Sequence, residues 1–203
     1  MFPGLWYTEN MERKFDTPTV TAIVIGTVLL IITEYYFYGF APSYVEWAVQ
    51  ICAATIVIIA TMYGMVAGIL IPAVALTITG AAFMGRDIFD DLVPLLLLGT
   101  ASGHYMDRLL VRRGDFSGMK ILDFCILETA LAILAWICIY PLERFYVYAT
   151  DLRTSLDKGI IYCGVSILGV LCICLPVLFL CNRLFRKKRL IEDARKEYLY
   201  DRK

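Results

Sequence analysis

Two carboxylate side chains lie inside long apolar stretches of the sequence. Glu34 lies toward the end of the first stretch, and Glu128 lies nine residues into the stretch that begins at Met119. An ionisable group at the centre of a membrane helix costs about 2.5–3.5 kcal/mol, so such groups are candidates for function. Glu128 would lie about 13 Å into the membrane at ~1.5 Å per residue. The chemistry that we expect of both is the binding of a polar ligand edge.

Charged residues also occur in two connections on the side of the membrane predicted to face outward. Arg86 and Asp87 lie in one connection, and Arg144 and Tyr146 open another. An arginine can hold an anionic or carbonyl edge of a ligand through a forked pair of hydrogen bonds. We therefore predict that Arg86 or Arg144 orients such a ligand.

Aromatic residues on the same side offer surfaces on which a ligand ring can stack. Trp136 lies about two helical turns beyond Glu128, and Tyr36 lies close to Glu34. The predicted substrate-binding residues are Glu34, Tyr36, Arg86, Asp87, Glu128, Trp136, Arg144 and Tyr146. Two alternatives stay open: the tyrosines could form an ordinary aromatic belt at the membrane interface, and the two glutamates could make structural hydrogen bonds to neighbouring helices.

These residues need helices to position them, and the composition predicts membrane-spanning ones. The chain has 203 residues, of which 60% are hydrophobic, and residues 47–83 contain no charged side chain. A span needs about twenty residues to cross ~30 Å of hydrocarbon. We predict an all-α polytopic membrane protein with six transmembrane helices: Val20–Phe40, Trp47–Tyr63, Met65–Phe83, Leu92–Tyr105, Met119–Tyr140 and Gly159–Cys181.

Glycine and proline residues set several of these boundaries. Gly64 divides the uninterrupted apolar run and predicts a tight turn there, and Pro141 predicts the end of the fifth helix. We expect a cytoplasmic segment over residues 1–15, which could form a short interfacial helix, a transmembrane domain over residues 16–183, and a charged cytoplasmic tail over residues 184–203.

The basic residues predict the orientation. Of the 19 lysines and arginines, 15 lie before the first span, after the fourth or after the sixth, and only four lie in the alternate connections. Basic residues near span ends are retained on the cytoplasmic side. Both termini are therefore predicted to be cytoplasmic, in a multi-pass protein of the bacterial plasma membrane.

Several classes of function find little support in the sequence. The seven cysteines lie within or beside apolar stretches, without a Cys-x-x-Cys pair, and are interpreted as packing residues. One histidine, His104, predicts no metal site, and the absence of a Gly-x-x-x-x-Gly-Lys-Ser/Thr loop excludes ATP hydrolysis by that route. We therefore expect no enzyme and no cofactor. We also expect no nucleic-acid partner, because an anionic membrane leaflet explains the basic clusters.

Pairs of small residues mark places where helices can approach closely. Ala22-x-x-x-Gly26, Gly64-x-x-x-Gly68 and Gly99-x-x-x-Gly103 have the spacing that leaves a groove for another helix. Packing within the chain is the simplest interpretation of each. The inner half of the first span is unusually smooth, however, and could dock a partner chain.

In this pattern the chain resembles the substrate-binding S components of energy-coupling factor transporters. Six short spans, the small pair in the first span, and the order of Gly64, Gly68, Pro94, Gly99 and Asp107 carry the resemblance, although that family's usual Ala-x-x-x-Ala is Ala22-x-x-x-Gly26 here. The resemblance implies capture of a vitamin-like substrate outside the cell.

The resemblance also implies partners: a transmembrane coupling subunit, contacted through Ala22 and Gly26, and two ATPase subunits. The residues do not rank riboflavin, folate, thiamine, pantothenate, a queuosine precursor or an amino acid as substrate. The alternative class is a non-transporting six-span scaffold, like the rod-shape proteins of bacterial cell-wall machinery, which has the same length and topology.

Overall fold

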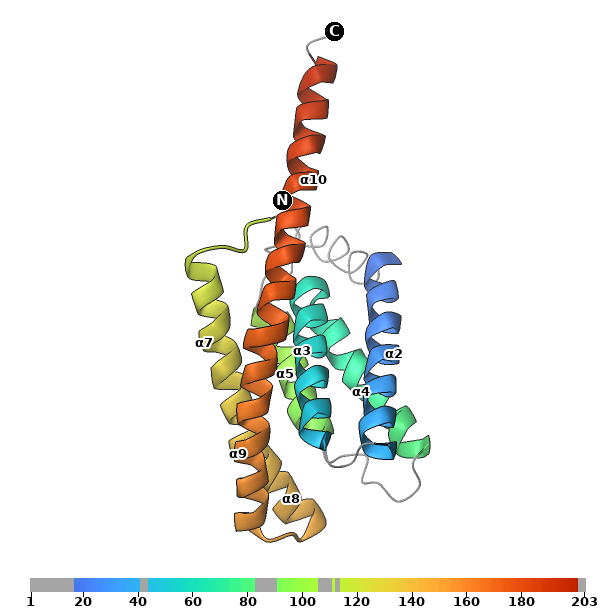
Figure 1. Ribbon diagram of the computed structural model, residues 1–203, viewed down its shortest axis with the longest axis vertical. Coiled ribbons are helices and arrows are strands. Elements are labelled where there is room, and N and C mark those ends of the chain that lie inside the picture. The colour runs from blue at the N-terminus through green and yellow to red at the C-terminus, as the bar shows by residue number, and fades with distance from the viewer. Residues whose placement is uncertain (1–16, 41–43, 83–90, 106–110, 112–113, 201–203) are drawn as a thin grey trace, which may run out of the picture.

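The computed structural model describes residues 17–40, 44–82, 91–105, 111 and 114–200, and these residues are almost entirely helical. Figure 1 shows the helices as an elongated bundle with α10 rising beyond one end. The beginning of α2 and the far part of α10 lie toward that same end. The helices are α2 (Thr17–Gly39), α3 (Val45–Tyr63), α4 (Met65–Ala82), α5 (Leu92–Tyr105), α7 (Met119–Ile133), α8 (Tyr140–Tyr148), α9 (Leu152–Gly169) and α10 (Leu175–Tyr200).

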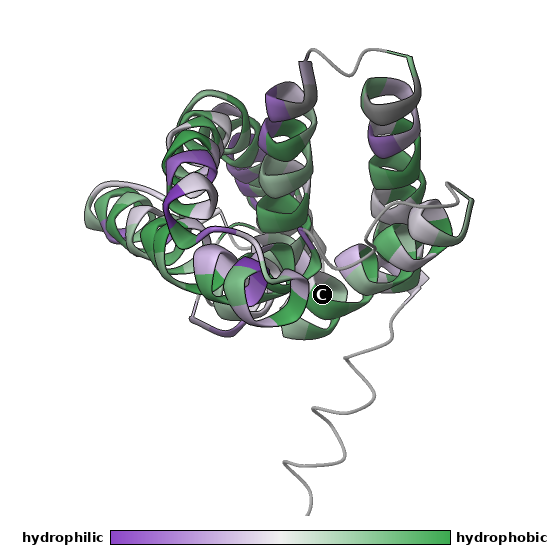
Figure 2. Ribbon diagram, turned by 90° about the horizontal axis from the view of Figure 1, so that it is seen from below, coloured by the Kyte–Doolittle hydropathy of each residue, from purple (hydrophilic) through white to green (hydrophobic). Residues whose placement is uncertain are grey.

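Five helical segments are long and apolar enough to cross a membrane. They are Thr17–Phe37, Glu46–Tyr63, Met65–Ala82, Met119–Tyr148 and Leu152–Ile191. The remaining predicted span, the fourth, corresponds to α5 and has the predicted bounds, but its 14 residues extend about 21 Å at ~1.5 Å per residue. Apolar side chains such as Val24, Ile25 and Ile32 cover the outside of α2, and Figure 2 shows hydrophobic residues on outward faces of the bundle. The chain is therefore a multi-pass membrane protein.

The turn predicted at Gly64 is confirmed. Helix α3 ends at Tyr63 and α4 begins at Met65, with Gly64 alone between them at φ 92°. The Gly64 N–H donates to the Ala60 carbonyl oxygen at 2.7 Å. Only glycine adopts this positive φ without steric penalty, so a single residue is enough to reverse the chain.

Pro141 does not end the fifth span, contrary to the sequence prediction. A π-helical segment, η3 (Leu134–Ile139), joins α7 to α8, and the helix continues to Tyr148. The Tyr140 N–H donates to Ala135, five residues back, and this wider turn accommodates the proline at the start of α8. The same device recurs in the sixth span, where η4 (Val170–Cys174) ends just before Leu175 and Pro176.

The sixth span is longer than predicted at both ends. It begins at Leu152 rather than Gly159, because the Asp151 carboxylate accepts hydrogen bonds from the Thr154 N–H at 3.0 Å and the Thr154 hydroxyl at 3.1 Å. This N-cap starts the helix before the apolar stretch, and the same hydrogen bonds lower the pKa of Asp151. Helix α10 continues to Tyr200, so the segment predicted as a charged tail is helical over nearly all of its length.

The Gly64–Gly68 pair of the α3–α4 turn and the Gly99–Gly103 pair of α5 pack against each other. A side chain on Gly68 would meet the Gly99 carbonyl group, and one on Gly99 would meet the Gly68 carbonyl oxygen. One turn away, a side chain on Gly103 would meet the backbone of Gly64 and Met65. Helices α4 and α5 thus cross with their backbones in contact, and these two motifs serve packing within the chain.

Helix α3 lies at the centre of the bundle and packs against α2, α4, α5 and α9. Its small buried residues, including Ala53 and Ala60, let these neighbours approach. The main core surrounds α3, and a second core gathers Phe116, Phe124 and Leu178 near the end of the bundle from which α10 extends. Helix α2, which carries Glu34 and Tyr36, packs directly on α3, whereas α7, which carries Glu128, packs on α5 and α9.

The predicted topology gives a direct test. Asp115 and Asp151 are both exposed, and Figure 1 places their connections at opposite ends of the bundle. In a variant whose native cysteines are replaced, Asp151→Cys should react with a membrane-impermeant maleimide added to intact cells. Asp115→Cys should react only after the cells are opened, because the basic residues place its connection inside. Labelling of both from the same side would contradict the six-span arrangement.

Candidate functional site

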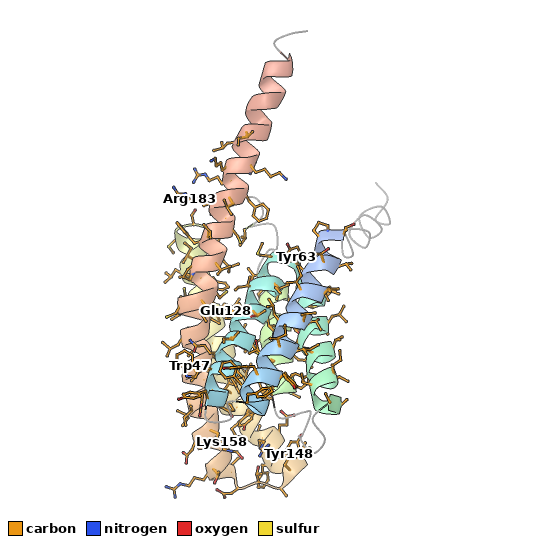
Figure 3. The ribbon with its side chains drawn as sticks, turned by 45° about the vertical axis from the view of Figure 1, so that its right-hand side comes forward. Trp47, Tyr63, Glu128, Tyr148, Lys158 and Arg183 are labelled. Atoms are coloured by element: carbon orange, nitrogen blue, oxygen red, sulfur yellow. The ribbon has the colours of Figure 1, made fainter. Side chains whose placement is uncertain are left out.

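Glu128 is a buried carboxyl group within the bundle. It lies on α7 with only 2% of its surface exposed, and the buried residues of this helix are Phe124, Glu128, Leu131 and Ala132. This spacing follows one face of a helix, so Glu128 occupies a core-facing position that the pattern would otherwise give to an apolar residue. Figure 3 shows Glu128 between Tyr63, near one end of the bundle, and Tyr148, near the other.

The surroundings of Glu128 offer its carboxyl group little compensation. Among the described residues, neither carboxyl oxygen has a hydrogen-bond partner. Ser102 on α5 lies near the carboxyl group, but its hydroxyl donates to the Leu98 carbonyl oxygen at 2.6 Å. A polar group buried without a partner costs about 1–3 kcal/mol, and a charged one costs more. This site therefore favours a ligand that brings its own hydrogen-bond donor.

Glu34 is also buried, but on a different side of the bundle. Its exposed fraction is 1%, on the face of α2 that also buries Gly26 and Leu30. The Cys52 thiol of α3 donates to Glu34 Oε1 at a sulfur–oxygen distance of 3.6 Å. Helix α2 packs against α3 and α4, whereas α7 packs against α5 and α9. Glu34 and Glu128 are thus buried between different sets of helices.

Trp136 lies in an aromatic cluster within the chain. Its side chain is fully buried in η3, and its ring contacts those of Tyr140 and Tyr162 at centroid distances of 5.7 and 5.3 Å. The indole N–H donates to the Ser166 hydroxyl at 3.2 Å. Helix α9 can approach this segment closely because Gly159 faces the Trp136 carbonyl oxygen. The indole ring is thereby fixed in place one to two helical turns from Glu128.

Three other predicted binding residues belong to the described part of the chain: Arg144 and Tyr146 on α8, and Tyr36 near the end of α2. Helix α8 and the end of α2 lie at the end of the bundle opposite to the one from which α10 extends (Figure 1). Arg144 on α8 places its guanidinium carbon 5.0 Å from the centre of the Tyr148 ring, a cation–π contact. Tyr146 is strongly exposed. Tyr36 is also exposed, and its ring contacts those of Phe37 on α2 and Phe40 just after α2. Among these contacts, none joins Arg144 or Tyr146 to Tyr36.

Two predicted binding residues, Arg86 and Asp87, lie outside the described residues. Within the described part, the structure brings Trp136 and Glu128 onto one continuous helical segment and places Arg144 farther along it. Glu34 and Tyr36 share α2. The candidate set therefore divides into an α7–η3–α8 group and an α2 group.

Thr61 and Asp91 are buried polar residues that were not among the predicted binding residues. Thr61 on α3 has a buried hydroxyl oxygen without a hydrogen-bond partner among the described residues. Asp91 is buried immediately before α5, and its carbonyl oxygen accepts from the Leu95 N–H at 3.1 Å. Its position three residues before Pro94 was a signal for a helix start. No sequence signal distinguished Thr61 from the exposed threonines.

The two predicted partner-interface residues differ in their surroundings. Gly26 is buried, and a side chain there would meet Ile59 of α3 and Ile71 of α4. Ala22 lines a groove of about 570 Å³ between α2 and α3. The other groove residues are Thr17, Pro18, Thr21 and Ile25 of α2 and Ile58, Ile59, Met62 and Tyr63 of α3. The structure thus uses Gly26 for packing within the chain and leaves Ala22 at an apolar surface depression.

Comparison with known proteins finds two relatives of similar size. A UPF0397 protein of Lacticaseibacillus casei (strain BL23) is 24% identical over 150 residues, covering 74% of this chain and 80% of that protein. A UPF0397 protein of Leuconostoc citreum (strain KM20) is 19% identical over 164 residues, covering 81% and 87%. The chain is distantly homologous to UPF0397 proteins.

The homology to UPF0397 proteins extends over most of both chains, so it includes most of the membrane-spanning helices. The name UPF0397 specifies no activity or ligand. No protein-family model and no solved structure matches the chain. The chemistry of the site must therefore be argued from Glu128 and its neighbours.

Proposed function

We propose that this chain is the membrane-embedded substrate-binding subunit of an energy-coupling-factor-type importer for a vitamin or similar micronutrient. It captures its substrate on the outer side of the membrane and transfers it inward together with a coupling subunit and two ATPases. The chain itself has a binding role and no catalytic one.

The observation that carries the proposal is the buried Glu128 carboxyl group without a partner. A scaffold gains nothing from an uncompensated acid in its core, because an apolar residue of similar size would pack there without the desolvation cost. A binding subunit gains a hydrogen-bond acceptor that a substrate N–H or O–H group can satisfy. The fixed ring of Trp136, about two helical turns farther along the same segment, is the aromatic group on which a substrate ring would stack.

The groove between α2 and α3 supports the coupling partner in the proposal. Its walls are apolar or small, with Ala22 and Thr21 on one side and Ile58 and Met62 on the other. A groove lined by small side chains lets another helix approach closely in a membrane. The groove lies at the end of the bundle that includes Tyr63 (Figure 3), which the basic residues predict to be cytoplasmic, where ATPases would reach it.

Purification of the tagged chain from its native membranes tests both parts of the proposal. We expect an ATPase pair and an integral membrane protein to co-purify, and mass spectrometry of the denatured sample to reveal a retained small molecule. Thr21→Leu combined with Ala22→Leu should fill the groove and weaken association with the ATPase-bearing partner roughly five- to a hundred-fold, because overpacking costs ~1–3 kcal/mol. The small molecule should be retained.

The matched control is Val20→Leu combined with Val24→Leu. Both valines are exposed on the same part of α2 but do not line the groove, so this variant should assemble as the wild type does. Equal assembly of the groove variant and the wild type would contradict docking at this surface. A wild-type sample with neither small molecule nor ATPase would favour a scaffold instead.

A further inference from the structure

A second depression, formed by the connection before α7, the start of α7 and part of α10, has a basic lining. It encloses about 480 Å³ and is lined by Gly114, Asp115, Ser117, Lys120, Arg186, Arg189 and Leu190. We call it the basic cleft. Three cations and one carboxylate line it, so three positive charges less one negative charge leave a net charge of +2. A concave surface with this charge is suited to a phosphate group.

The cleft has a fixed wall formed by the connection before α7. The Phe116 N–H donates to Asn182 Oδ1 at 2.9 Å, and Asn182 Nδ2 donates to the Phe116 carbonyl oxygen at 3.0 Å. This pair of hydrogen bonds attaches the connection to α10 through both backbone polar groups of one residue. The Phe116 side chain is fully buried, and its ring meets that of Phe124 edge-on at 5.6 Å.

Gly114 brings the same connection against α10. Its φ is +77°, and a side chain there would meet the Cα and Cβ atoms of Arg186. The close approach therefore needs glycine both for its conformation and for its size. Because Gly114 and Phe116 are both held against α10, Lys120 of α7 and Arg186 of α10 line the same cleft before any ligand arrives.

Apolar side chains are also exposed on both helices that line the cleft. Leu190 contributes to its lining. Met119 and Leu122 of α7 are exposed, as are Leu180 and Leu184 of α10. Arg183 is the first basic residue after the apolar part of the sixth span (Figure 3), so the cleft lies where a membrane helix passes from hydrocarbon into the headgroup region. A soluble anion would use the cations but not this apolar surface.

We propose that the basic cleft binds the phosphate headgroup of an anionic membrane phospholipid, whose acyl chains lie along the exposed apolar residues of α7 and α10. Basic pockets at the cytoplasmic ends of membrane helices have the chemistry for such headgroups. The site is separate from Glu128 and does not depend on the proposed transport function. Lipid binding would fix the depth at which the α7 end and α10 meet the membrane.

Native mass spectrometry of the purified chain with added phosphatidylglycerol or phosphatidylcholine tests the proposal. We expect a one-to-one complex with phosphatidylglycerol and little with phosphatidylcholine. Lys120→Ala combined with Arg186→Ala should weaken the phosphatidylglycerol complex roughly ten- to a hundred-fold, because charged hydrogen bonds contribute about 1.5–3 kcal/mol. Arg183→Ala combined with Lys187→Ala removes one arginine and one lysine of α10 outside the cleft and should leave the complex nearly unchanged.

Equal losses in the two double variants would overturn the proposal, because general attraction to positive charge would then explain the binding. Inorganic phosphate, added at the same concentrations without lipid, distinguishes a soluble anion: equal affinity with the same variant dependence would also overturn it. A photo-crosslinkable phosphatidylglycerol on the wild-type chain supplies an independent measurement. Crosslinks should concentrate in residues 114–122 and 180–190, and crosslinks spread evenly over the helices would contradict the site.

Discussion

Gly99→Leu should abolish the folded protein. A leucine side chain at this position would meet the Gly68 carbonyl oxygen of α4 and the Cγ2 atom of Ile56 on α3. A backbone carbonyl cannot rotate away as a side chain can, so the two helices must separate. Overpacking alone costs about 1–3 kcal/mol, and the loss of the α4–α5 crossing should raise the total above ~4 kcal/mol, a loss at the upper end for single substitutions.

Gly164→Leu is the matched control for this variant. Gly164 is exposed within α9, and no atom lies within 4 Å of the position where its side chain would begin. Size-exclusion chromatography of fluorescently tagged protein after detergent extraction should give a single peak for Gly164→Leu and aggregated or degraded protein for Gly99→Leu. Equal peaks and equal thermal stability would contradict the close backbone crossing.

Glu128→Gln should weaken substrate binding roughly ten- to a hundred-fold, since a charged hydrogen bond in a desolvated site contributes about 1.5–3 kcal/mol. The fold should be preserved or slightly stabilised, because the Ser102 hydroxyl near the carboxyl group donates to the Leu98 carbonyl oxygen, and a glutamine keeps the size of the side chain. This combination separates a binding role from a structural one, since a structural carboxyl group would lower stability when it is replaced.

Titration of riboflavin, folate, thiamine and pantothenate, or of the compound recovered from the purified protein, gives the affinities. Asp123→Asn provides the control, because Asp123 is an exposed acid on the same helix. Arg144→Ala tests whether the substrate reaches as far as α8, where Arg144 contacts the Tyr148 ring. Unchanged affinity for Glu128→Gln, together with reduced thermal stability, would assign Glu128 to the structure of the bundle.

The sequence by itself determined the helices and several of their limits. The bounds of α5 and the turn at Gly64 agree with the prediction because they depend on local properties: the length of an apolar run, and the positive φ that glycine adopts without penalty. The burial of Glu34 and Glu128 was also expected from their position within apolar stretches. Each of these inferences needs only neighbours along the chain.

Other features required the tertiary structure. Pro141 was predicted to end a helix, but a π-helical turn before it removes the steric conflict, and Gly159 of α9 packs against the Trp136 carbonyl oxygen within that turn. Likewise, the spacing of small residues predicted that another helix could approach closely at Gly26. Only the tertiary structure shows that Ile59 and Ile71 of the same chain pack there.

The basic cleft is the clearest example of a feature that the sequence alone does not predict. Asn182 and Phe116 are 66 residues apart in sequence and form two hydrogen bonds, yet neither residue has an unusual sequence context. The number of basic residues in each segment of the sequence predicted that many of them lie at one end of the bundle. Which of them face one another across a cleft depends on how two distant helices are joined, and that is decided by packing between elements rather than by any local pattern.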